Sequence, residues 1–174
     1  MGKIFAGLLF VFLHFRINGF DLLPDFVGYV LVWRGMKSLP ECTSWQKSWA
    51  AVAAVASVAM FGVSLVGIRF PGMLGLGVSL VMTALQLAVV FDIVWGLEEL
   101  EQMTDAELQA AWLRKVWYII LIATAAGYAG SLLRSAGIVS MASILAMVGI
   151  VCCLVGAYKA WRSYDAWRGE PPIL

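Results

Sequence analysis

Charged residues are scarce in this chain of 174 residues, because only 13% are Asp, Glu, Lys or Arg while 62% are hydrophobic. Soluble domains contain about 25% charged residues, and a chain this short has too much surface to hide so much hydrocarbon from water. A water-soluble fold is nearly excluded, and we expect a single membrane domain over residues 1–174. The balance of 12 basic and 11 acidic residues leaves no cationic excess for binding nucleic acid through its phosphates.

Cysteine and histidine are also rare. The cysteines are Cys42, Cys152 and Cys153, without a C-x-x-C spacing, and His14 is the only histidine. A disulfide framework, a zinc site and a redox pair therefore lack support. The sequence also lacks a nucleophile elbow, an H-E-x-x-H motif and a phosphate-binding glycine loop. We expect no enzymatic activity, no metal and no cofactor.

Long apolar runs, by contrast, recur along the chain. Each is near or above the roughly 20 residues that cross about 30 Å of hydrocarbon. They lie at residues 45–68, 72–97, 116–133 and 137–160. Two shorter apolar segments, at residues 4–15 and 24–39, precede them.

The sequence thus predicts an all-α, polytopic transmembrane helix bundle of six segments arranged as three helical hairpins. The hairpins are expected at residues 1–40, 45–102 and 103–168, and the first is short. Residues 4–39 leave three alternatives open: a short hairpin, a re-entrant pair, or one broken helix. The N-terminus imitates a signal peptide, but no small-x-small cleavage site follows its apolar stretch, so we expect it to be retained.

Basic residues are distributed unevenly between the expected connections. One side holds Arg34, Lys37, Lys47, Arg114, Lys115, Lys159, Arg162 and Arg168, whereas the other keeps Arg69 and Arg134. All eight tryptophans fall at or near the more basic side. Because Lys and Arg accumulate on the cytoplasmic side and Trp at the headgroups, we expect a protein of the cytoplasmic membrane with both termini cytoplasmic.

The turns of the three expected hairpins share the pattern R-x-x-G, beginning at Arg16, Arg69 and Arg134. Two interpretations are open. Arg near a helix end followed by Gly is ordinary C-terminal capping chemistry. Alternatively, three arginines that converge within a Debye length of about 8 to 10 Å add their fields, and then mark the mouth of an anion-binding bundle.

The densest polar cluster lies in the connection of the first hairpin. Ionisable groups at membrane depth are costly and are candidates for function. The cluster consists of His14, Arg16, Asn18, Asp21 and Asp25. Asp25 suits the first turn of a helix, where the helix dipole favours a carboxylate. We predict that the chain between His14 and Asp25 is non-helical and that Asp21 faces Arg16 or another basic residue.

Another intramembrane carboxylate, Asp92, lies about one turn before Trp95 within an apolar run. Three roles are open for it. The side chain can extend toward the interface, pair with a basic residue of a neighbouring helix, or bind a coupling proton.

The segment Glu98–Lys115 carries the only strong signal outside the membrane. Thr104 and Glu107 form an S/T-x-x-E capping box, which predicts that a helix begins there. We expect helices from residue 72 to about 102 and from 105 to 133. The acidic side chains are expected either to pair with Arg34, Lys37 or Lys159, or to bind a cytoplasmic partner.

Small residues recur at helical spacing on three segments, where they allow helix backbones to approach closely. They predict a tightly packed bundle, within one chain or in a homo-oligomer. The three faces are Gly72, Gly75, Ser79 and Thr83; Ala126 and Gly130; and Gly149, Cys153, Gly156 and Ala160.

The opening of the chain, with LPDFVGY at Leu23–Tyr29 and G-x-x-x-L at Gly35–Leu39, resembles small uncharacterised multi-pass membrane proteins of low-GC Gram-positive bacteria. The resemblance covers about forty residues, and it includes the apolar N-terminal segment that precedes these motifs. It implies a bacterial inner-membrane protein and brings no activity or ligand with it.

We therefore expect a non-enzymatic membrane protein that binds or passes a small, anionic solute. The alternative is a membrane-embedded accessory or scaffold protein that binds other proteins. The candidate binding residues are His14, Arg16, Asp21, Asp25, Arg69, Asp92 and Arg134.

Overall fold

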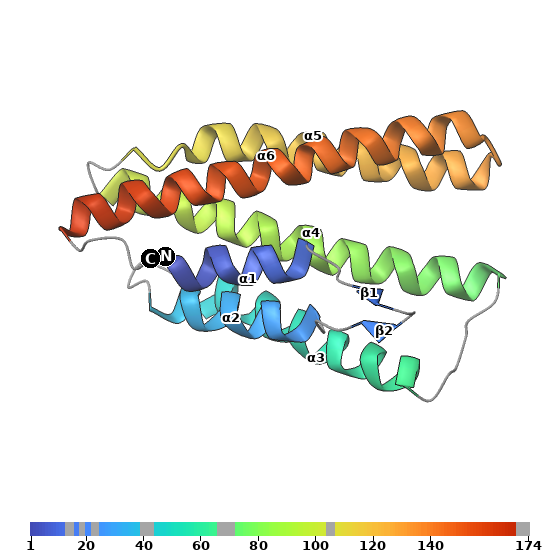
Figure 1. Cartoon of the computed structure of the whole chain (residues 1–174), viewed down its shortest axis with the longest axis horizontal. Coiled ribbons are helices and arrows are strands. Elements are labelled where there is room, and N and C mark those ends of the chain that lie inside the picture. The colour runs from blue at the N-terminus through green and yellow to red at the C-terminus, as the bar shows by residue number, and fades with distance from the viewer. Residues whose placement is uncertain are drawn as a thin grey trace. The chain divides into compact units, whose positions relative to one another are not determined.

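The computed structural model describes residues 1–12, 16–17, 20–21, 25–38, 44–65, 72–103 and 107–169 (Figure 1). These residues form six helices and one pair of two-residue strands, which confirms the predicted all-α class. Three helices, α4 (Gly72–Met103), α5 (Ala110–Leu132) and α6 (Ala136–Arg168), are long and apolar enough to cross a membrane. The chain divides into two compact units, Met1–Gly96 and Leu97–Leu174, each described here by itself.

The first unit contains three helices and a strand pair before α4. Helices α1 and α2 run antiparallel and are packed together along their length (Figure 1). They form a short helical hairpin, so a single broken helix is ruled out. The elements are α1 (Gly2–Phe12), β1 (Arg16–Ile17), β2 (Phe20–Asp21), α2 (Asp25–Lys37) and α3 (Ser44–Leu65).

Glycines set the distance between α1 and α2. A Cβ added to Gly7 would lie 2.6 Å from the carbonyl oxygen of Gly28, and one added to Gly28 would lie 2.8 Å from the carbonyl oxygen of Gly7. The two backbones are therefore in direct contact at this point, as the small residues of membrane helices allow. Leu8 and Val32 are buried beside the contact.

The chain between α1 and α2 is extended where it is described. Strands β1 and β2 pair antiparallel, and α2 begins at Asp25. The prediction of a non-helical connection is thus confirmed for its described residues. The pairing of β1 and β2 supplies hydrogen-bond partners to this connection, because an irregular backbone near lipid persists only if its N–H and C=O groups find partners.

Helix α3 packs against α2 rather than extensively against α4, the partner expected from a hairpin at residues 45–102. Its buried positions Ala50, Ala53 and Ser57 are small and follow helical spacing, so they form a flat contact stripe. Helix α3 contains 22 residues, and its part with described side chains, Trp49–Val63, is apolar. The expectation that this helix crosses the membrane stays a prediction.

The second unit consists of the end of α4 and the antiparallel pair α5 and α6 (Figure 1). The predicted small-residue face of α6 packs on α5, since a Cβ on Gly149 would lie 2.6 Å from Ile120 and one on Gly156 would lie 2.6 Å from Leu113. The corresponding face of α4, in the first unit, differs. Gly72 is exposed and has nothing within 4 Å of an added Cβ.

We predict that Gly28→Ala lowers the free energy of unfolding by about 1 to 3 kcal/mol, because its methyl group overlaps the backbone of α1. Gly77→Ala is the matched control. Its added Cβ has nothing within 4 Å, so the higher helix propensity of alanine should leave stability equal or slightly higher. Denaturant unfolding in detergent micelles measures both, and equal effects of the two substitutions would contradict the packing.

Candidate functional site

The polar connection of the first hairpin is only partly described. His14 lies outside the described residues, and for Arg16 and Asp21 the backbone alone is described. The register makes the Cα atoms of Arg16 and Asp21 direct partners across β1 and β2, which agrees with the predicted pairing at the level of the backbone. Asp25 is the first residue of α2 and is half-buried, as its expected place at the positive end of the helix dipole requires.

The arginine turns give one clear result, at Arg134. This exposed residue has a left-handed φ of 53° and follows Leu133, the C-cap residue of α5. Its N–H donates to the carbonyl oxygen of Ser131 at 3.2 Å, and the N–H of Ser135 donates to that of Gly130 at 2.9 Å. This is the hydrogen-bond pattern of a Schellman C-cap.

The backbone of Arg134 thus takes part in capping α5, and these bonds do not involve its guanidinium group. The capping interpretation relied on the glycine after the arginine, but Arg134 itself holds the left-handed position. Arg69 lies outside the described residues, and only the backbone of Arg16 is described. The convergence of the three arginines therefore stays a prediction.

Asp92 is the most enclosed of the predicted site residues with a described side chain. It lies in the part of α4 that belongs to the first unit, and its exposed fraction is 5%. Its Oδ2 atom is buried and has no hydrogen-bond partner among the described residues. Asp92 therefore does not extend its carboxylate to an exposed position, which was one of its three expected roles.

Hydroxyl groups on the long helices are satisfied locally. In each of four cases the hydroxyl donates to the carbonyl oxygen four residues earlier, at 2.7 to 2.9 Å: Thr83 to Ser79, Thr124 to Ile120, Ser131 to Gly127, and Ser143 to Val139. Groups bonded in this way need no water. These four residues therefore do not by themselves form a polar path.

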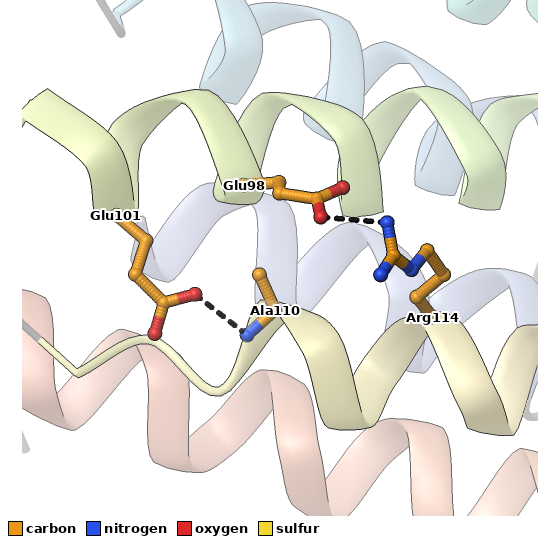
Figure 2. Close-up of polar contacts among 4 residues, drawn as sticks. All are labelled: Glu98, Glu101, Ala110 and Arg114. Atoms are coloured by element: carbon orange, nitrogen blue, oxygen red, sulfur yellow. Dashed lines mark hydrogen bonds and ion pairs between the residues drawn. The ribbon is translucent and has the colours of Figure 1, made fainter.

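The connection between α4 and α5 is organised by Glu101. Its Oε1 accepts the N–H groups of Leu108 at 3.0 Å and Gln109 at 3.1 Å, and its Oε2 accepts that of Ala110 at 3.1 Å. Figure 2 shows the carboxylate directed at the first residue of α5. The N–H groups at a helix start have no partner within the helix, and the helix dipole favours a negative charge there.

This arrangement corrects the predicted capping box. Glu107 lies before α5 and is exposed, whereas α5 begins at Ala110, later than the predicted start at residue 105. Thr104 lies outside the described residues. The cap belongs to the preceding helix, and a local motif search misses it because Glu101 is nine residues before Ala110.

Glu98 also connects the two helices. Arg114 donates to its carboxylate at 2.8 Å across the connection (Figure 2). Arg114 belongs to α5, the next helix along the chain, and is not one of the expected partners Arg34, Lys37 and Lys159. Lys37 instead places its Nζ 3.8 Å from the ring centroid of Trp33, a cation–π contact. Glu98 and Glu101 thus both hold α4 to the start of α5.

Comparison of the chain with protein-family models, with curated proteins and with solved structures finds no match. Any function must therefore be argued from the residues themselves. Within the part of the chain that the structure describes, no group of three His, Cys, Asp or Glu side chains is placed to hold a metal ion.

We predict that Glu101→Ala lowers the free energy of unfolding by about 1 to 2 kcal/mol, because three N–H groups lose their acceptor. The amides of Leu108, Gln109 and Ala110 should exchange with deuterium faster in the same variant. Glu107→Ala is the control and should leave both quantities unchanged. A larger loss of stability in Glu107→Ala than in Glu101→Ala would contradict the Glu101 cap and support the capping box that the sequence predicts.

Proposed function

We propose that this chain is a non-enzymatic integral membrane protein that binds a small solute among its helices, with Asp92 as a residue of the binding site. The supporting observation is the buried Oδ2 atom of Asp92, which has no hydrogen-bond partner among the described residues. Asp92 lies on a helix that is long and apolar enough to cross a membrane. A carboxylate in this setting is costly, and such residues are functional candidates by default.

The chemistry of Asp92 indicates the class of solute. A carboxylate accepts hydrogen bonds when charged and donates one when protonated. It therefore complements a small solute that carries N–H or O–H groups. The anionic preference expected from the arginine turns stays a prediction, because Arg134 is the one arginine of the three turns whose side chain the structure describes.

Binding is favoured over passage across the membrane. A path for a polar solute needs side chains that replace its water along the whole membrane. On α4, the hydroxyl of Thr83 already donates to the carbonyl oxygen of Ser79. Asp92 therefore fits a binding position better than one step of a continuous polar path.

A scaffold function is the second candidate, and the start of α4 favours it. The small residues Gly72 and Gly75 lie at helical spacing, and Gly72 has open space around it. The neighbouring Met73 and Leu74 are exposed. The exposed start of α4, with small residues at helical spacing, suits association with a helix of another protein.

We further propose that the protein lies in the cytoplasmic membrane with both termini and the connection between α4 and α5 on the cytoplasmic side. The unequal distribution of basic residues and tryptophans supports this orientation.

Single cysteines at positions 107 and 134, introduced after the native cysteines are replaced, test the orientation. Both positions are exposed and lie at opposite ends of α5. In intact cells, a membrane-impermeant thiol reagent should label Arg134→Cys, whereas Glu107→Cys should react only after permeabilisation. Labelling of position 107 in intact cells would reverse the proposed orientation.

Asp92→Asn tests the proposed site. Without solute, we expect the variant to unfold at the same temperature as the wild type or higher, because the cost of burying a charge is removed. A panel of small amines, amides and polyols should include compounds that stabilise the wild type, by about 2.7 kcal/mol at a hundred times the dissociation constant. This stabilisation should disappear in Asp92→Asn.

Asp165→Asn is the matched control, since Asp165 lies near the polar end of α6. Thermal unfolding in micelles measures all three proteins. The proposal fails if no compound of the panel stabilises the wild type, or if Asp92→Asn responds as the wild type does.

A further inference from the structure

A shallow groove lies where the polar end of α6 passes the start of α5, within the second unit. Its lining includes two cationic side chains of α6. The lining residues are Gln109, Val155, Tyr158, Lys159, Arg162 and Ser163. Asp92 belongs to the first unit and is not among the lining residues.

The groove attracts negative charge. Lys159 and Arg162 are exposed and three residues apart, so they lie on the same side of α6. Within residues 97–103 and 107–169, neither side chain forms an ion pair or a hydrogen bond. Both cations are therefore available to an anion, and Arg in particular can contact a phosphate through two N–H groups.

An apolar stripe leads into this groove along α6. Ile144, Val148, Val151 and Val155 are spaced by four, three and four residues, and Lys159 follows after four more. Their exposed fractions are 66%, 54%, 53% and 47%. At 1.5 Å per residue the four apolar side chains cover about 16 Å, which is close to half of the roughly 30 Å hydrocarbon thickness.

The aromatic side chains beside the groove fit the boundary between hydrocarbon and water. Tyr158 and Trp161 contact each other edge to face, with ring centroids 5.9 Å apart. Such rings have an apolar body and a polar edge, and they concentrate at the level of the lipid headgroups. Rings of this kind beside Lys159 and Arg162 are typical of the headgroup level of a leaflet, where phosphates are found.

We propose that this face of α6 binds an anionic phospholipid, with its phosphate at Lys159 and Arg162 and an acyl chain along Ile144–Val155. The apolar stripe distinguishes this ligand from a free anion, which would contact only the two cations. Basic grooves at the membrane surface of transmembrane helices bind anionic headgroups by this combination of charge and apolar contact. The inference does not depend on Asp92 or on the proposed solute.

Native mass spectrometry of the full, delipidated chain tests the proposal. Titration with phosphatidylglycerol should give a one-lipid complex at lower concentration than titration with zwitterionic phosphatidylcholine. The double variant K159Q/R162Q should weaken phosphatidylglycerol binding about 30-fold, since each cation near a membrane surface contributes about five-fold. K159R/R162K keeps both charges and should retain most of the affinity.

K115Q is the matched control, because Lys115 is an exposed cation of α5 that does not line the groove. It should bind phosphatidylglycerol as the wild type does. An equal loss in K115Q would show unspecific attraction by the whole basic end and overturn the proposal. Equal affinity for the two lipids would also overturn it, as would displacement of the lipid by inorganic phosphate at the same concentration.

Discussion

Backbone N–H and C=O groups lose their helical partners wherever the chain leaves a helix, and the need to replace these partners governs the connections. Three described helix ends or connections have such a replacement. The ladder of β1 and β2 pairs extended backbone, the Schellman bonds close α5 at Arg134, and the Glu101 carboxylate covers the N–H groups before and at Ala110. The same need for hydrogen-bond partners explains why hydroxyls on the long helices donate to carbonyl groups of their own helix.

Helix association in the structure depends on small residues rather than on contrasts of polarity. Gly7 and Gly28 bring two short helices into backbone contact, and Gly149 and Gly156 receive large side chains of α5. Lipid tails are as apolar as the helix faces, so close van der Waals contact is what favours one helix neighbour over lipid. Asp92 is a clear departure from this pattern, and for that reason it carries the functional argument.

Much of the fold could be predicted from the sequence where one residue type has a strong local effect. The predicted apolar run and α4 both begin at residue 72, and the position of Asp25 located the start of α2. The partner of α3 could not be predicted, because an apolar membrane helix has no polar face that shows which side is packed. The cap of α5 was missed for another reason, since the side chain of Glu101 acts across a connection. The sequence identified the candidate site only as a set of ionisable residues whose burial in a membrane costs free energy. Whether the three arginines meet depends on tertiary structure, which local patterns do not encode.

The shortness of the first hairpin affects the lipid as well as the protein. Helices α1 and α2 contain 11 and 13 residues, so they are only about 16 and 20 Å long, against roughly 30 Å of hydrocarbon. Direct contact between their backbones at Gly7 and Gly28 makes this pair a rigid unit that cannot lengthen. A bilayer around such a pair must become thinner, or the pair must remain within part of its depth, and each costs a fraction of a kcal/mol per ångström of mismatch. Within a bilayer, a hairpin of this length would match thin regions best.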